Sequence, residues 1–125
     1  MDGGRLILLV DDDPLLLGYA HRYLVRLGYE VLMARSPEEA TAALADHDVP
    51  FSLAIIDVTV GGGLASNFGR LMQQQDPDLP ILYWSGYSIP EEQLREGHAG
   101  RVGFLTKPFR PRQFKELIEQ LVRRS

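Results

Sequence analysis

The chain has 125 residues, a net charge of −4 and 45% hydrophobic residues, which fits one compact domain and is too apolar for a disordered tail. The acidic balance argues against general affinity for nucleic acid, and the lack of cysteine excludes disulfides, thiolate zinc sites and a cysteine nucleophile. No segment has the run of about 20 apolar residues that a membrane span requires. We therefore expect a single domain over residues 1–125, with a core at about 5–123, in a reducing cytoplasm.

The first half of the chain alternates between strand-like and helix-like patterns. Residues 6–10 (LILLV) form a continuous apolar run, which is typical of a strand buried on both faces. A helix is predicted from Pro14 to Leu27, with Gly28 as its stop. Its inward face would consist of Leu16, Ala20, Leu24 and Leu27.

A weaker strand is predicted at 30–34 (EVLMA), followed by a helix through about residue 45. The capping box 36–39 (SPEE) marks the start of this helix. Its inward residues would be Ala40, Ala43 and Leu44.

Three further strand–helix pairs follow. Apolar runs predict strands at 53–56, 81–84 and 102–105. The third helix has the stripe Leu64, Phe68, Leu71 and Met72. A short fourth helix is predicted from about Ser88 to Gly97. The fifth helix follows Pro111, and its stripe is the clearest, consisting of Phe114, Leu117, Ile118, Leu121 and Val122.

Strands that alternate with helices predict βαβ units, and hence an α/β fold with a parallel sheet covered on both faces. In such a sheet, ligands bind at the carboxyl ends of the strands. Four of the predicted strands end in residues suited to phosphoryl chemistry. These residues are Asp11 and Asp12, Asp57, Ser85, and Lys107.

The adjacent carboxylates of Asp11 and Asp12 repel each other unless a cation joins them, which favours a Mg²⁺ site. Asp13 precedes Pro14 and is better explained as the cap of the first helix. Asp57 is suited either to a third metal ligand or to a nucleophile that accepts a phosphoryl group. Ser85 and Lys107 could contact phosphoryl oxygens.

Together these residues resemble the receiver domain of two-component response regulators, the CheY-like family. The resemblance covers almost the whole chain. It rests on four segments, 7–14 (ILLVDDDP), 55–57 (IID), 84–87 (WSGY) and 103–109 (GFLTKPF). It implies a three-layer, doubly wound (βα)5 flavodoxin-like sandwich with the strand order 2-1-3-4-5.

The resemblance also implies roles for individual residues. Asp57 would accept a phosphoryl group from the phosphohistidine of a partner kinase, and Ser85 and Lys107 would contact that group. Asp11, Asp12 and Asp57 would hold Mg²⁺ with the backbone carbonyl of Thr59. Ser85 and Phe104 would form the switch.

The implied partners are a sensor histidine kinase or a histidine phosphotransfer protein, and a downstream protein target or an attached domain. Phosphorylation would act through the face formed by the fourth helix, fifth strand and fifth helix. The chain would be a self-catalysing phosphoacceptor rather than a turnover enzyme. It would bind neither nucleic acid nor membrane, and a homodimer is left open.

One departure from the family pattern leaves an alternative open. Residues 58–64 (VTVGGGL) replace the family's Met-Pro-Gly-type loop, so a pseudo-receiver that binds partners independently of phosphate is the main rival. A phosphatase related to haloacid-dehalogenase-like hydrolases would need a longer chain. The three histidines, His21, His47 and His98, show no ligand spacing and are predicted to lie on the surface.

Overall fold

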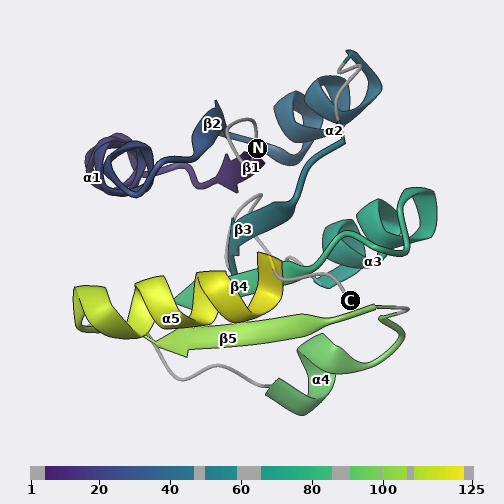
Figure 1. The fold of residues 1–125 in the computed structure, drawn as a ribbon. Helices are drawn as coiled ribbons and strands as arrows, with labels where there is room; N and C mark the ends of the chain where they lie inside the picture. Colours follow the sequence, from purple (N-terminus) through teal and green to yellow (C-terminus); the bar gives the residue numbers. More distant parts are fainter. Residues whose placement is uncertain are drawn as a thin grey trace.

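The computed structural model describes residues 5–46, 50–58, 66–85, 91–98, 100–106 and 109–122. Within these ranges, strands and helices alternate along the chain (Figure 1). In chain order, the elements are β1 (Leu6–Val10), α1 (Pro14–Arg26), β2 (Glu30–Ala34), α2 (Pro37–Asp46), β3 (Leu53–Asp57), α3 (Ser66–Gln75), β4 (Ile81–Ser85), α4 (Glu91–Arg95), β5 (Val102–Thr106) and α5 (Pro111–Val122).

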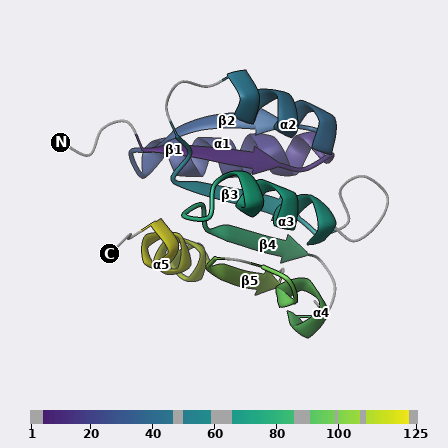
Figure 2. The same cartoon turned by 90° about the vertical axis from the view of Figure 1, so that its right-hand side faces the viewer.

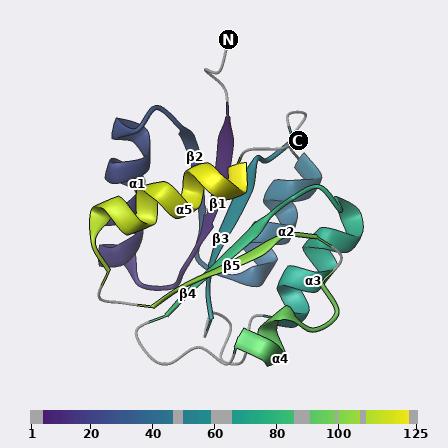
Figure 3. The same ribbon diagram turned by 60° about the horizontal axis from the view of Figure 1, so that its bottom comes forward.

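The five strands form one parallel sheet in the order β2-β1-β3-β4-β5, which confirms the predicted α/β class and strand order. Helices α1 and α5 cover one face of the sheet, and α2, α3 and α4 cover the other (Figures 1 and 3). The result is the three-layer arrangement that alternating strands and helices predict.

The side chains of β1 explain why its sequence is apolar throughout. Leu6, Leu8 and Val10 join the core cluster beneath α2, α3 and α4. Ile7 and Leu9, which point the other way, join the cluster beneath α1 and α5. Alternate residues of a strand point to opposite faces, so a strand covered on both sides needs apolar residues at every position.

Local signals at the helix ends are confirmed. The Oδ1 atom of Asp13 accepts a hydrogen bond from the backbone N–H of Leu15 at 3.0 Å, so Asp13 caps α1 as predicted. Gly28 follows α1 with a φ of 102°, a conformation that glycine adopts without a steric penalty. At α2, Ser36 Oγ accepts from the N–H of Glu39, whose own carboxylate accepts from the N–H of Arg35.

The face of α3 differs from the prediction. Met72 is buried and Phe68 is partly buried against the core, but Leu71 is 58% exposed. The physical reason lies in α2, whose facing residues Ala42 and Ala45 are too small to cover Leu71. They leave an open groove of about 580 Å³ between the two helices.

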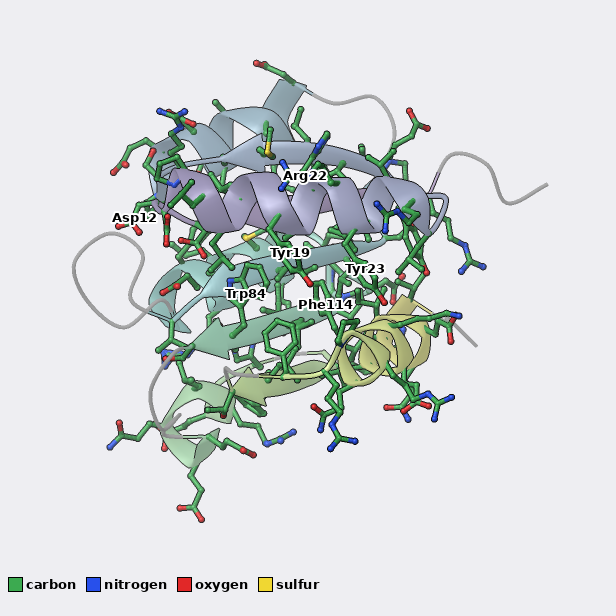
Figure 4. All side chains as sticks on the ribbon, turned by 90° about the vertical axis from the view of Figure 1, so that its left-hand side faces the viewer. Asp12, Tyr19, Arg22, Tyr23, Trp84 and Phe114 are labelled. Atoms are coloured by element: carbon green, nitrogen blue, oxygen red, sulfur yellow. The ribbon has the colours of Figure 1, made fainter. Side chains whose placement is uncertain are left out.

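Of the predicted inward face of α1, Ala20 and Leu24 are buried and Leu16 packs partly buried against the same core cluster; Leu17, which was not predicted, is buried with them. The apolar stripe of α5 is confirmed. Phe114 from this stripe stacks on Tyr23 of α1, with ring centroids 5.7 Å apart (Figure 4). The Tyr23 hydroxyl donates a hydrogen bond to the carbonyl oxygen of Pro111, with 2.9 Å between the two oxygens. This contact ties the two helices together. Among the described helices, none combines the length and apolarity needed to cross a bilayer.

Candidate functional site

The carboxyl ends of the parallel strands lie at one edge of the sheet (Figure 2). The register of β1 and β3 pairs Val10 with Ile56, so Asp11 and Asp57 each follow a paired position. Asp57 is itself paired with Trp84, and the next residue of β4, Ser85, is paired with Thr106. Three neighbouring strands therefore bring Asp11, Asp57 and Ser85 to the same edge.

The carboxylates at this edge have different environments. Asp11 is fully buried, and its Oδ1 atom accepts a hydrogen bond from the backbone N–H of Asp13 at 2.9 Å. Asp12 is exposed at the N-terminal end of α1 (Figure 4), and Asp57 is half-buried. Burying an ionised carboxylate costs free energy, which hydrogen bonds and a nearby cation offset, so a positively charged ligand at this edge would stabilise the ionised form of Asp11.

The chemistry of these residues fits Mg²⁺. Within the described ranges, no three His, Cys, Asp or Glu side chains are arranged closely enough to hold a metal by themselves. Mg²⁺, however, is usually bound through one or two carboxylates and completes its octahedron with water and phosphate oxygens. The predicted contributions of the Thr59 carbonyl and of Lys107 lie outside the described residues.

The two residues predicted to form a switch lie on neighbouring strands. Ser85 is buried at 3% exposure at the end of β4. Phe104 of β5 is half-buried and stacks on Tyr83, with ring centroids 6.0 Å apart. The guanidinium of Arg95 from α4 lies 4.8 Å from the centroid of the Phe104 ring, within the range of a cation–π interaction. The ring is thus held between β4 and α4.

Sequence reasoning missed a hydrogen-bonded chain behind this ring. His98, predicted to be a surface residue, is half-buried, with Nε2 2.8 Å from the Tyr83 hydroxyl and Nδ1 2.8 Å from Oε1 of Gln73. The surface prediction for His98 is therefore wrong. His21 has intermediate exposure on α1, and His47 lies outside the described residues.

One residue in the sequence, Gly69, indicates this hydrogen-bonded group of side chains. Gly69 lies inside α3, where glycine is unfavourable relative to alanine. A Cβ at Gly69 would clash with the Tyr83 hydroxyl. The Tyr83 hydroxyl therefore packs against α3 only because residue 69 has no side chain.

The surroundings of these hydrogen-bonded side chains shift the pKa values of Tyr83 and His98. Burial raises the pKa of Tyr83 well above its usual value, and the nearby Arg70 only partly opposes this rise. Burial lowers the pKa of His98, and the positive charges of Arg70 and Arg95 lower it further. Folding therefore disfavours the protonated imidazolium of His98.

Comparison with known proteins shows the family to which this fold belongs. Residues 7–119 match the family model of the response regulator receiver domain. The chain belongs to the response regulator receiver family. Its relatives include the heme response regulator HssR of Staphylococcus saprophyticus, at 27% identity over 94% of this chain and 51% of that protein. Regulatory protein VanRB of Enterococcus faecalis is 31% identical over 95% of this chain and 53% of its own length.

Solved receiver structures have the same fold. A CheY-like receiver domain protein from Methanospirillum hungatei superposes with a TM-score of 0.83 at 26% identity, covering 94% of this chain and 93% of that one. The non-phosphorylated HemR receiver domain from Leptospira biflexa gives a TM-score of 0.80 at 26% identity, covering 97% and 96%. This chain is thus a receiver domain of two-component signalling, and it spans about half the length of HssR and VanRB.

Proposed function

We propose that Asp57 of this receiver domain is the phosphoacceptor of a two-component phosphorelay. The observation that carries the proposal is the placement of Asp57 at the carboxyl end of β3, between the buried Asp11 beyond β1 and the buried Ser85 at the end of β4. A half-buried carboxylate at this position can be reached by an incoming phosphoryl group while its other side is held by the sheet.

In the proposed reaction, a carboxylate oxygen of Asp57 attacks the phosphorus atom in line with the leaving group. A P–O bond to Asp57 forms as the bond from phosphorus to the donor breaks, and the leaving group keeps the electron pair. The hydroxyl of Ser85 would donate a hydrogen bond to one phosphoryl oxygen, and Lys107 would pair with another. Water later hydrolyses the acyl phosphate and restores the free carboxylate.

The metal in this proposal is Mg²⁺, held by Asp11, Asp12, Asp57 and the carbonyl of Thr59. When bound, it would offset negative charge on the phosphoryl oxygens. The ligand chemistry at the sheet edge supports this assignment. The structure of the response regulator TrrA from Thermotoga maritima, which was solved in complex with Mg²⁺–BeF, also supports it. TrrA superposes on this chain with a TM-score of 0.80 at 24% identity.

The proposed phosphodonor is a sensor histidine kinase or a histidine phosphotransfer protein. Receiver domains of response regulators are signalling switches rather than enzymes that turn over a metabolite. The charge added at Asp57 would move Ser85 and Phe104 and change binding at the face formed by α4, β5 and α5. The output would be read by a downstream protein or an attached domain.

Intact mass spectrometry after incubation with Mg²⁺ and acetyl phosphate tests the proposal. We expect the parent chain to gain one phosphoryl group and Asp57→Asn to gain none. Asp46→Asn, which changes an exposed aspartate at the end of α2, is the matched control and should still be modified.

Two results would contradict the proposal. Equal modification of the parent and Asp57→Asn would show that another residue is the acceptor. A folded, unmodified parent at saturating Mg²⁺ would instead favour a phosphate-independent interaction module.

A further inference from the structure

The chain of side chains behind Phe104 joins three separate parts of the fold. Gln73 lies on α3, Tyr83 lies on β4, and His98 lies in the connection between α4 and β5. Every link is a short hydrogen bond of 2.8–3.0 Å. Because each group belongs to a different element, a change at one link affects how those elements are held together.

The orientation of Gln73 is fixed by its neighbours. Its Nε2 atom donates to the carbonyls of Leu79 at 2.9 Å and Arg101 at 3.0 Å, and carbonyls can only accept. Its Oε1 atom accepts from the backbone N–H of Gly100 at 3.0 Å. Rotating the amide by half a turn would place donors against a donor and an acceptor against acceptors, so the described orientation is the only one that satisfies all three contacts.

This orientation determines the tautomer of His98. Since Oε1 of Gln73 is an acceptor, Nδ1 of His98 must carry the proton and donate to it. Nε2 of the neutral ring is then an acceptor, so the Tyr83 hydroxyl must donate to it. The hydrogen bonds run in one direction, from Tyr83 through His98 to Gln73.

A second proton on His98 would break this arrangement. Nε2 would become a donor, and the Tyr83 hydrogen would need a new acceptor. Tyr83 is fully buried, and its hydroxyl lies against Gly69, where there is no room even for a Cβ. The imidazolium would also face Arg70 from α3 and Arg95 from α4, while Phe104 from β5 contributes no charge.

The hydrogen-bonded side chains of Gln73, His98 and Tyr83 are connected to the proposed switch through ring contacts. Tyr83 and Phe104 are directly paired in the register of β4 and β5, and their rings stack. Tyr83 also contacts the ring of His98 edge-on at 5.6 Å. The positive charge of Arg95 from α4 opposes protonation of His98, and its guanidinium lies 4.8 Å from the centroid of the Phe104 ring.

We propose that Gln73, His98 and Tyr83 form a lock that holds Phe104 against turning while His98 is neutral and that opens when His98 takes up a proton. The three are positioning residues, because they act through Phe104 and not on the phosphoryl group. The inference rests on the proposed function, in which Phe104 moves as Asp57 is phosphorylated.

The test is a pH titration of the full chain by NMR, with labelled histidine and phenylalanine rings. We expect the Phe104 ring signal to follow the His98 signal, with a common midpoint below the ordinary histidine value of about 6.5. In Tyr83→Phe, which keeps the stacked ring, Phe104 should no longer follow the titration of His98. His21→Gln, which removes a histidine on α1, should leave the coupling unchanged.

A second measurement uses the reciprocity of linked equilibria. If protonation and switching both open the lock, a ligand that favours switching must raise the His98 midpoint. With Mg²⁺ and beryllofluoride as the phosphoryl mimic, we expect a rise of about 0.7 pH unit, which corresponds to one hydrogen bond of about 1 kcal/mol. A histidine with a purely structural role would show no such shift.

The outcomes separate the lock from the proposed function. If acetyl phosphate modifies the chain but Phe104 does not follow His98, or the midpoint is unmoved by beryllofluoride, the lock is overturned and the phosphoacceptor stands. If Phe104 follows His98 but the chain is never modified, the coupling is supported and the phosphoacceptor assignment is overturned. Persistence of the Phe104 response in His98→Gln would also overturn the lock.

Discussion

Asp11, Asp12 and Asp13 follow one another in the chain, yet each has a different environment. Asp11 is buried, Asp12 is exposed, and Asp13 caps α1 through its contact with the N–H of Leu15. We expect Asp13→Ala to lower the free energy of unfolding by about 1 kcal/mol, because the first turn of α1 loses its cap. Urea unfolding measures this change.

Asp12→Ala is the matched comparison at the residue scale. It changes an exposed neighbour that makes no helix cap, so it should alter the free energy of unfolding by less than about 0.5 kcal/mol while weakening Mg²⁺ binding. Asp13→Ala should still take a phosphoryl group from acetyl phosphate. If Asp12→Ala proved the more destabilising of the two, our assignment of the cap would be wrong.

Helix α3 packs closely on strand β4 where Gly69, which has no side chain, meets the large side chain of Tyr83. Alanine is normally favoured over glycine inside a helix by about 1 kcal/mol, but a Cβ at Gly69 would clash with the Tyr83 hydroxyl. We therefore expect Gly69→Ala to destabilise the domain despite the better helix propensity. Removing the hydroxyl with Tyr83→Phe should relieve part of this cost.

A double-mutant cycle measures that relief. The effects of Gly69→Ala and Tyr83→Phe on unfolding free energy should be non-additive by about 0.5–3 kcal/mol, the range for residues in contact. Gly18→Ala on α1 is a suitable control, since the nearest atom to an added Cβ there is 3.6 Å away on Arg22. Simple additivity of the two changes would show that the close fit does not govern stability.

For the whole molecule, His98 and Tyr83 set limits to stability at opposite ends of the pH scale. As pH falls below about 6.5, the unfolded chain binds a proton at His98 that the folded chain resists, so the free energy of unfolding decreases. As pH rises above about 10, the unfolded chain releases the Tyr83 proton that the folded chain retains, and the free energy of unfolding decreases again.

Urea unfolding across this pH range checks both slopes. His98→Gln should flatten the acid side and Tyr83→Phe the alkaline side, whereas His21→Gln should follow the parent. Profiles that keep the parental shape in both variants would count against the stated pKa directions.

The parallel sheet could be predicted from sequence because four of its strands are apolar runs separated by helical segments, and the placement of Asp11, Asp57 and Ser85 followed from the strand ends. The roles of these residues stay predictions. Leu71 and His98 were misplaced for a different reason. The exposure of Leu71 depends on small residues of α2, and the environment of His98 depends on Gln73 and Tyr83. Such contacts between distant segments leave no periodic pattern in the sequence.

The domain contains a single tryptophan, and its position makes tryptophan fluorescence a probe of the fold. Trp84 is fully buried and stacks on Phe109 and Phe114, with ring centroids 6.1 and 5.7 Å away. It also precedes Ser85 and is paired in register with Asp57. Its fluorescence therefore comes from one chromophore that lies in the core beneath α5 and borders the sheet edge at which phosphoryl transfer is proposed. An unlabelled sample can report both unfolding and events at that edge through the colour and intensity of one emission band.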